Sequence, residues 1–280
     1  MFMDKVKNIA DKGIADKDGY AAQKGRYDLL IFGGQSNMEG QTECLPEPND
    51  PVDGALEYFY LKDALLPLKH PVGEDIGDLL GGACFGNGSL VPFFCRAYVK
   101  ASDRKVIAVH AAKGATTVSE WQPGTPIYRE ALKKIRGALD KVGRSNIDKI
   151  YYMWLQGESD ALISTSCEDY LRLLTEYKNA LKKDVGIDRF CIIKVGYFCG
   201  VVSGVKDRPK DVAIACDETI MKAQDIAAET DSDFVMLTDI CPKIVLLDEY
   251  VNPFEEGHFN NKAMKLIGET GGKALAELCK

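Results

Sequence analysis

The sequence lacks an excess of positive charge and lacks a long apolar run. Its 35 Lys and Arg residues are outnumbered by 42 Asp and Glu residues, and the formal net charge is −7, so no basic surface is expected that would bind a phosphate backbone or anionic lipids. Residues 1–27 contain no apolar segment long enough for a signal peptide or a membrane span. We therefore expect a cytoplasmic protein whose partners are neither nucleic acid nor membrane.

The nine cysteines lack the C-x-x-C spacing and the nearby histidines of a zinc site. Their number is odd and they are scattered along the chain. Cys95, Cys191 and Cys199 lie in apolar stretches, where a free cysteine packs as a small core residue. We expect reduced thiols and no metal.

Five short aliphatic runs alternate with five segments whose apolar residues recur at helical spacing. The strands are expected at 29–32, 106–111, 150–155, 190–195 and 234–237, and the helices at 90–100, 128–142, 168–183, 217–229 and 260–278. This alternation predicts an α/β fold, a three-layer α/β/α sandwich around a mostly parallel five-stranded sheet. The length favours a single domain over residues 1–280, with an N-terminal extension at 1–27.

Two segments interrupt the alternation. Residues 41–88 are dense in Pro, Gly and Asp and have no clear period, and so long an excursion inside a compact domain is usually functional or disordered. We expect it to form one wall of the active site. A shorter excursion, 241–257, precedes the last helix and is expected at the same edge, beyond the carboxyl ends of the strands.

A serine lies in a glycine-rich turn directly after the first predicted strand. Residues 33–40 read GGQSNMEG, and the flanking glycines allow Ser36 to project and its N–H to point at a developing oxyanion. Met38 stands where the elbow of α/β-hydrolases has its second glycine, so this is not a G-x-S-x-G motif. Ser36 is a candidate nucleophile, although serine and asparagine are also common in turns for conformational reasons.

A serine nucleophile needs a base, and the sequence has only three histidines. His70 lies beside a proline in the irregular excursion, and His110 lies inside an apolar strand, where a histidine is usually a core residue. His258 follows a polar loop that carries carboxylates and opens the last predicted helix. We expect His258 to be the base, with a carboxylate of its loop on the other ring nitrogen.

Two further turns after predicted strands supply polar groups. Gln156 follows the third strand, and Gly114 lies in the turn after the second. We expect the side-chain amide of Gln156 and the backbone N–H groups of Gly114 and Ser36 to stabilise an oxyanion. Glu158 is expected either to orient Gln156 or Ser36 as an acceptor or to cap the following helix.

Together these blocks resemble the SGNH hydrolase superfamily, in the branch of carbohydrate esterase family 6 acetyl xylan esterases and the sialate O-acetylesterase domain. The resemblance rests on G-Q-S-N-M at 34–38, G-A-T-T-V-S-E-W at 114–121 and Q-G-E-S-D at 156–160, and it spans roughly residues 28–275. It implies a flavodoxin-like fold and a serine hydrolase without a metal or other cofactor. It also places Gln35 and Asn37 among the binding residues and Trp121 in the acyl or sugar pocket.

The last block departs from the D-x-x-H pattern of this branch. The residue three before His258 is Glu255, so the resemblance implies Glu255 as the orienting acid. Glu256 is a weaker candidate, and Asp248 or Glu249 would serve only if the preceding loop folds back. The implied reaction removes acetyl groups through an acetyl-enzyme, with activity falling below about pH 6 as the histidine protonates.

Three functions remain open on the sequence. The first is deacetylation of acetylated xylo-oligosaccharides, and the second is deacetylation of O-acetylated sialic acid, whose carboxylate would need a cation such as Arg96, Lys113 or Arg129. The third is an inactive carbohydrate-binding protein in which the change to Glu255 marks decay of the site. The sequence leaves the oligomeric state undetermined.

Overall fold

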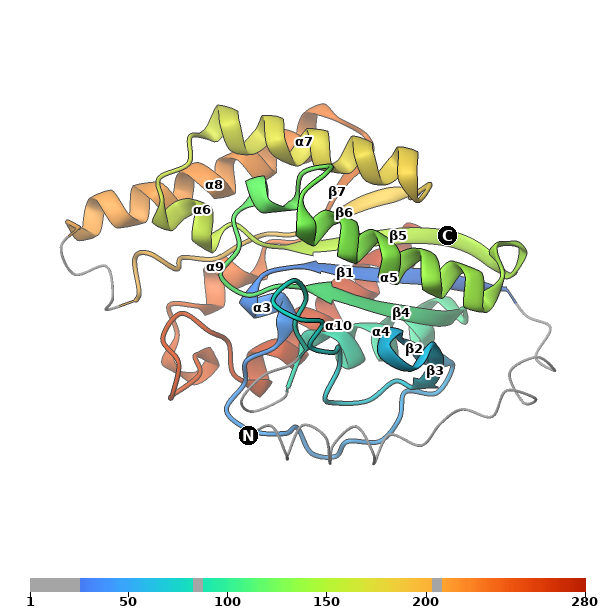
Figure 1. Cartoon of the computed structure of the whole chain (residues 1–280). Helices are drawn as coiled ribbons and strands as arrows, with labels where there is room; N and C mark the ends of the chain where they lie inside the picture. The colour runs from blue at the N-terminus through green and yellow to red at the C-terminus, as the bar shows by residue number, and fades with distance from the viewer. Residues whose placement is uncertain (1–25, 83–87, 203–207) are drawn as a thin grey trace.

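A seven-stranded sheet organises the molecule, seen in a computed structural model that describes residues 26–82, 88–202 and 208–280 (Figure 1). The strand order is β3-β2-β4-β1-β5-β6-β7, with β2 and β3 antiparallel and the other neighbours parallel. The strands are β1 (Tyr27–Gly34), β2 (Ala55–Phe59), β3 (Ala64–Pro67), β4 (Lys105–Ala112), β5 (Ile147–Leu155), β6 (Arg189–Ile193) and β7 (Phe234–Thr238). The predicted α/β class and mostly parallel sheet are confirmed.

Helices cover both faces of the sheet and make the predicted three layers (Figure 1). One face carries α4 (Leu90–Ser102), α9 (Ile240–Ile244) and α10 (Asn261–Glu277); the other carries α5 (Pro126–Val142), α7 (Cys167–Asp184) and α8 (Lys210–Thr230). Short helices are α3 (Ser36–Glu39), α6 (Glu158–Leu162) and the 3₁₀ turns Tyr60–Lys62, Val118–Trp121, Arg144–Asn146 and Asp248–Tyr250. In the described ranges no helix is both long and apolar enough to cross a bilayer.

The helix starts follow from capping residues that the sequence carries. The side chains of Ser89, Thr125 and Asn260 accept hydrogen bonds from backbone N–H groups in the first turns of α4, α5 and α10, which satisfies donors that a helix start leaves unpaired. The five predicted helices are confirmed. Helix α8 begins seven residues earlier than expected, directly after Pro209, which is its N-cap residue.

The sheet has two strands more than predicted, and both come from the excursion 41–88. Strands β2 and β3 form a hairpin at the sheet edge. They are short and contain Ala, Glu and Pro rather than β-branched residues. Their sequences therefore do not predict strands. The excursion is fastened to α5 by a fully buried ion pair, in which Lys134 Nζ lies 2.8 Å from a carboxylate oxygen of Glu74.

The sheet is buried on both faces, and its residues alternate between two apolar layers. Leu29 and Ile31 of β1 pack toward α5, α7 and α8, whereas Leu30 and Phe32 pack toward α4 and α10, as the two-residue period of a strand requires. Cys95, Cys191 and Cys199 are buried, as the apolar context predicts. Cys84 lies outside the described residues.

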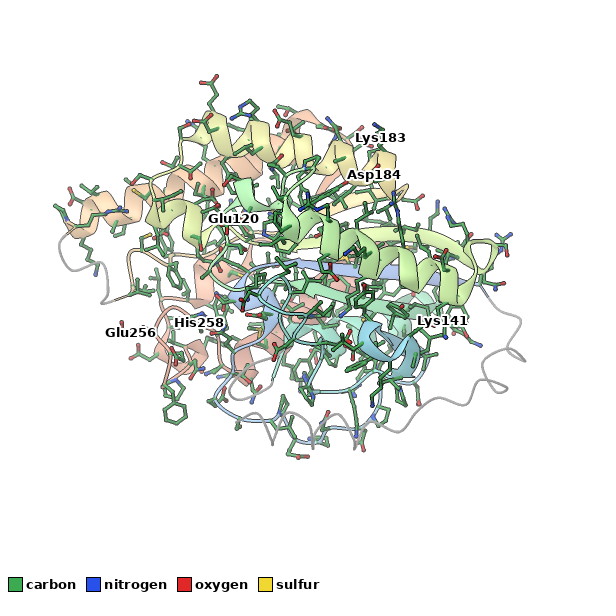
Figure 2. All side chains as sticks on the ribbon, viewed as in Figure 1. Glu120, Lys141, Lys183, Asp184, Glu256 and His258 are labelled. Carbon is green, nitrogen blue, oxygen red and sulfur yellow. The ribbon has the colours of Figure 1, made fainter. Side chains whose placement is uncertain are left out.

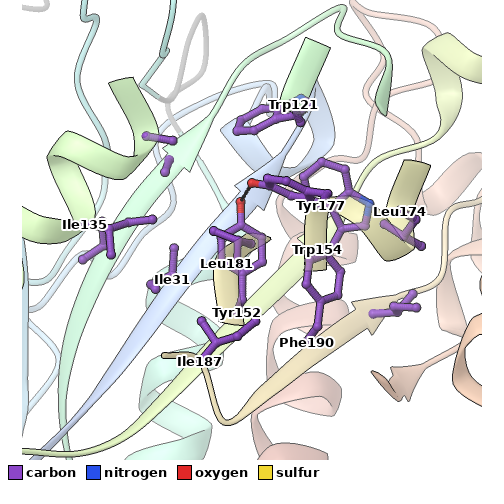
Figure 3. Packing of buried hydrophobic residues seen from close by; sticks show 14 of the residues in the cluster. Ile31, Trp121, Ile135, Tyr152, Trp154, Leu174, Tyr177, Leu181, Ile187 and Phe190 are labelled. Atoms are coloured by element: carbon purple, nitrogen blue, oxygen red, sulfur yellow. Dashed lines mark hydrogen bonds between the residues drawn. The ribbon is translucent and has the colours of Figure 1, made fainter. Parts of the chain in front are cut away.

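Aromatic rings fill the layer beneath α5 and α7 (Figure 3). Trp121 stacks edge-on against Trp154 at 5.4 Å between ring centroids, and both are fully buried beside Tyr177. This corrects the expectation that Trp121 lines the acyl or sugar pocket: its ring has no exposed surface, and its Nε1 donates to Thr116 Oγ1 at 3.0 Å. Trp121 instead anchors the turn that follows β4.

The two ends of the sheet differ in what they carry. Lys141 near the end of α5, and Lys183 and Asp184 at the end of α7, lie at the edge of the molecule opposite His258 (Figure 2). The strands β1, β4 and β5 end on the side of His258. Of the expected extension 1–27, residues 1–25 lie outside the described ranges, and Tyr27 is the first residue of β1.

Candidate active site

Strand register brings three of the predicted turns together. Gly34, the last residue of β1, pairs with Ala112 at the end of β4 and with Leu155 at the end of β5. The segments that carry Ser36, Gly114 and Gln156 therefore leave the sheet side by side.

The turn before Ser36 requires glycine. Gly34 has a φ of +143°, and a Cβ there would lie 2.0 Å from the carbonyl oxygen of Leu155, so no side chain fits. The close approach lets the N–H of Gln35 donate to that same carbonyl at 3.1 Å. Ser36 then opens α3 and is 6% exposed, which places its hydroxyl in a fixed and mostly desolvated position.

His258 meets this serine from a loop far away in the sequence. Its Nε2 lies 2.9 Å from Ser36 Oγ, which is hydrogen-bonding distance for a nucleophile and its base. The ring of Phe198 packs edge-on against the imidazole at 5.9 Å. Gly257 before it has a φ of +75° and touches Phe198 so closely that a Cβ would overlap the ring.

A backbone carbonyl, not a carboxylate, accepts from the other nitrogen of the imidazole. His258 Nδ1 lies 3.1 Å from the carbonyl oxygen of Glu256, and Glu256 and His258 are neighbours in Figure 2. This corrects the expectation for Glu255: its backbone carbonyl accepts from the His258 N–H at 3.2 Å, while its carboxylate acts on the ring only through space. Glu249 forms an ion pair with Lys262 instead of swinging in.

Burial lowers the pKa of His258 and so favours its neutral form. Desolvation lowers the pKa of His258 below its usual 6.5, and the Glu256 carbonyl and the charge of Glu255 oppose that shift. A neutral imidazole with its N–H on the backbone carbonyl leaves Nε2 free to accept the serine proton. This geometry and the lowered pKa of His258 are what the predicted roles of Ser36 and His258 require at neutral pH.

Two backbone donors are placed for an oxyanion. In the part of the chain that the structure describes, no hydrogen bond engages the N–H of Ser36 or of Gly114. A Cβ on Gly114 would lie 3.7 Å from Ser36 Cβ and 2.7 Å from a carboxylate oxygen of Glu39, so Gly114 packs directly beside the nucleophile. Both N–H groups therefore remain available for the oxyanion role, which stays a prediction.

Gln156 has a different role from the one predicted. Its Nε2 donates to Asp160 Oδ2 at 2.6 Å and to the Thr116 carbonyl at 2.8 Å, and Gln35 Oε1 lies 3.3 Å away. Because two amide hydrogens already face three acceptors, none is left for an oxyanion. Gln156 is fully buried and ties together the turns that follow β1, β4 and β5.

Gln35 completes this connection from the serine side. Its Oε1 accepts from the backbone N–H of Ser159 at 3.1 Å and of Gly157 at 3.4 Å. Gln35 is 2% exposed, so it supports the turns from inside rather than contacting a ligand.

Asn37 and Glu158 form a second buried connection. The Nδ2 of Asn37 donates to Glu158 Oε1 at 2.9 Å and to the Gly257 carbonyl at 3.2 Å, and its Oδ1 accepts from the N–H of Phe259 at 3.2 Å. The predicted contact of Glu158 with Gln156 or Ser36 is replaced by this contact with Asn37. Glu158 is also the first residue of α6.

Two residues that sequence reasoning missed hold these turns. Asn252 donates from Nδ2 to the Gln41 carbonyl at 2.6 Å, and its N–H donates to the His258 carbonyl at 2.8 Å; the Asn-Pro pair was the available signal. Asp160 accepts from the Val118 N–H at 2.8 Å as well as from Gln156. The excursion 41–88 thus contacts the histidine loop through Gln41, and its strands β2 and β3 widen the sheet.

The other histidines lie apart from the Ser36–His258 pair. His110 is buried in β4 with Nε2 at 3.2 Å from the Met38 carbonyl, and His70 accepts from the N–H of Ser89. Within the described residues no three His, Cys, Asp or Glu side chains gather as a metal site.

Comparison with known proteins finds one matching family and several similar folds. A family described as "Carbohydrate esterase, sialic acid-specific acetylesterase" matches residues 26–238. A structure from Arabidopsis thaliana is 19% identical with a TM-score of 0.66 over 90% of this chain and 98% of that one, and NanS is 16% identical with a TM-score of 0.62 over 91% and 98%. A carbohydrate acetylesterase from Xanthomonas citri is 15% identical with a TM-score of 0.55 over 89% of this chain and 55% of its own.

At these identities the structures share the fold with this chain, and the family match confirms the resemblance that the three motif blocks predicted. Comparison with curated protein sequences gives no match. The matched range includes Ser36 and Gly114 and ends before His258. The histidine is therefore assigned by its geometry alone.

Proposed function

Because this chain belongs to the carbohydrate esterase family of sialic acid-specific acetylesterases, and so is a carboxylic ester hydrolase, we propose that it removes acetyl groups from a small carbohydrate through an acetyl-enzyme on Ser36. The observation that carries the proposal is the 2.9 Å contact between Ser36 Oγ and His258 Nε2. A serine hydroxyl within hydrogen-bonding reach of an imidazole that can take its proton is what nucleophilic ester hydrolysis needs.

The proposed reaction has two steps. His258 Nε2 takes the proton of Ser36 while Oγ attacks the acetyl carbonyl carbon, and the N–H groups of Ser36 and Gly114 stabilise the oxyanion. The bond to the sugar oxygen then breaks, and that oxygen takes the proton from the imidazolium. Water repeats the sequence on the acetyl-enzyme, releasing acetate and restoring the serine.

Two sugars compete as the natural substrate. Acetylated xylo-oligosaccharides are favoured by the motif blocks shared with acetyl xylan esterases. O-acetylated sialic acid is favoured by the family description and by Lys113, a half-buried cation next to Gly114 whose ammonium has no partner among the described residues. Arg96 and Arg129 donate instead to the carbonyls of Asp50 and Gly124.

The test is acetate release from both sugars by the wild type and by Ser36→Ala. We expect release from one sugar and a loss of about 10⁵-fold or more in kcat for the variant, as for other serine hydrolases. Thr175→Ala, a hydroxyl deletion on the outer part of α7, is the matched control and should keep full activity. Activity that survives in Ser36→Ala would mean that the nucleophile is another residue.

The inactive-binder alternative gives the opposite result. A protein that only binds sugar would release no acetate and would hydrolyse p-nitrophenyl acetate at the rate of the Ser36→Ala variant. A cytoplasmic location also stays a prediction, and fractionation of the cells that make the protein tests it.

A further inference from the structure

The orientation of the catalytic histidine depends on the backbone of its loop. His258 Nδ1 has the Glu256 carbonyl as its acceptor, and a carbonyl oxygen moves with its peptide unit. Whatever holds residues 256–259 in place therefore holds the imidazole toward Ser36.

Asn37 holds that backbone on both sides of the histidine. Its side-chain amide donates to the carbonyl of Gly257 and accepts from the N–H of Phe259, each at 3.2 Å. Asn37 directly follows the nucleophile and is 2% exposed. One buried amide thus fixes the distance between the two reacting groups.

Glu158 is the remaining partner of this amide. Its Oε1 accepts from Asn37 Nδ2 at 2.9 Å, and its Oε2, also buried, has no hydrogen-bond partner in the described part of the chain. A buried carboxylate with one free oxygen is costly for folding. Buried titratable groups of this kind cluster at functional sites.

The groups around Glu158 do not offset its charge. Asp160 lies on the same helix, Asp217 faces it from α8, Tyr170 from α7 and Cys241 from α9. All four are acidic or neutral. The hydrogen bond from Asn37 is therefore the main interaction that favours the ionised form.

We propose that Glu158 is a positioning residue for the hydrolysis: its carboxylate, acting through Asn37, holds the His258 loop at reacting distance from Ser36. This inference rests on the proposed function of the Ser36–His258 pair. An ionised acceptor binds the amide more strongly than a protonated one does. The loop is then held most firmly when Glu158 is charged.

The pKa values give this role a signature in the pH profile. Burial raises the pKa of Glu158 to about 7, whereas burial lowers the pKa of His258 below 6.5. As the pH falls, Glu158 is protonated first and weakens the hold on Asn37, and His258 is protonated afterwards. The wild type should show an inflection in kcat near pH 7 above the histidine inflection.

The experiment measures kcat and KM for p-nitrophenyl acetate between pH 5 and 9. At pH 8, Glu158→Gln should lower kcat about tenfold with KM nearly unchanged and should remove the inflection near pH 7, because the neutral amide is a weaker acceptor. Asn37→Ala should lower kcat about 100-fold, and adding Glu158→Gln to it should change nothing further. Glu130→Gln, a buried glutamate on α5 remote from the site, is the matched control.

Two results would overturn the proposal. One is an unchanged kcat and pH profile in Glu158→Gln. The other is a double variant whose loss is the product of the two single losses, since independent effects multiply. Glu158→Asp, which keeps the charge at a shorter reach, covers a folding failure of the Gln variant: it should lose activity yet keep the inflection near pH 7.

A second readout separates this proposal from the proposed function. The chain has only three histidines, so the NMR signals of the His258 ring can be assigned with a His258→Asn variant. In the wild type the ring signal should shift near pH 7 as well as at its own titration, and Glu158→Gln should lose the first shift. This NMR result does not depend on whether the protein hydrolyses an ester. If the His258 signal in the wild type shows only its own titration, the positioning role of Glu158 is wrong, whereas the proposed function is unaffected.

Discussion

Ser36 and His258, the proposed nucleophile and base, are held in place by different parts of the structure. Ser36 follows β1, the central strand, which is buried along its whole length and paired with β4 and β5. His258 lies in a loop whose Phe254 is 76% exposed, and the amides of Asn37 and Asn252 fasten this loop. Ser36 is thus fixed by the core and His258 by a few hydrogen bonds.

Because of this difference, substitutions around Ser36 and substitutions in the His258 loop should have different effects on stability and activity. A change on the serine side disturbs buried contacts that the whole fold shares, so stability and activity should fall together. A change on the histidine side moves a loop that opens locally at little cost, so activity should fall without a matching loss of global stability.

Gln156→Ala should break the serine side. It removes a fully buried amide that donates to Asp160 and Thr116 and accepts from Tyr170, leaving these groups without a partner. We expect a loss of roughly 2 to 4 kcal/mol in the free energy of unfolding, measured by urea denaturation. Activity should fall as well because three turns are released.

Gln122→Ala is the matched control for this substitution. Gln122 donates to the carbonyls of Val118 and Leu173 but is only partly buried, so the loss should be about 1 kcal/mol. Equal losses in the two variants would refute the idea that the serine side shares its stability with the core.

Glu158→Gln should separate stability from activity on the histidine side. The folded-state pKa of Glu158, about 7, is raised above the usual 4.5, so its protonation favours the folded state. That contribution is full below pH 4.5 and is lost as the pH rises toward 7. The Gln variant has no such loss, so its stability relative to the wild type should improve by about 2 kcal/mol between pH 5 and pH 8.

Thermal unfolding of both proteins at the two pH values measures this change. If Glu158→Gln is more stable than the wild type at pH 8 but has a lower kcat, the charged carboxylate destabilises the folded protein while it supports activity. The same relative stability at both pH values would mean that Glu158 is not protonated near neutral pH in the folded protein.

Glu255→Gln should have the smallest effect. Its carboxylate raises the pKa of His258 only through space, so the variant should lower that pKa further and move the acid limb of the kcat profile to lower pH. We expect kcat at pH 8 within about threefold of the wild type, as for a weak through-space interaction. Glu229→Gln, which removes an exposed charge on α8, is the control. A loss of about 10⁴-fold in the kcat of Glu255→Gln would instead support a triad in which Glu255 orients His258.

Much of the fold was readable from the sequence because its signals are local. The five buried strands are short aliphatic runs, and the caps Ser89, Thr125 and Asn260 mark helix starts. Strands β2 and β3 were missed because an edge hairpin depends on pairing with β4 rather than on its own composition. Trp121 was misplaced for a related reason, since its burial depends on Trp154 and Tyr177 from other elements.

The candidate nucleophile and the candidate base could be predicted from the sequence, because a glycine-rich turn and a small number of histidines are visible in the chain itself. The edge of the sheet where they meet could also be predicted, because it follows from the order of the strands. Only the tertiary structure decided what surrounds them. The acceptor at His258 Nδ1 is a backbone carbonyl, the amide of Gln156 is consumed by Asp160 and Thr116, and Glu158 reaches the histidine loop through Asn37. The two contacts of Asn37 join segments more than a hundred residues apart, and hydrogen-bond partners at that separation are set by the packing of the fold rather than by local sequence.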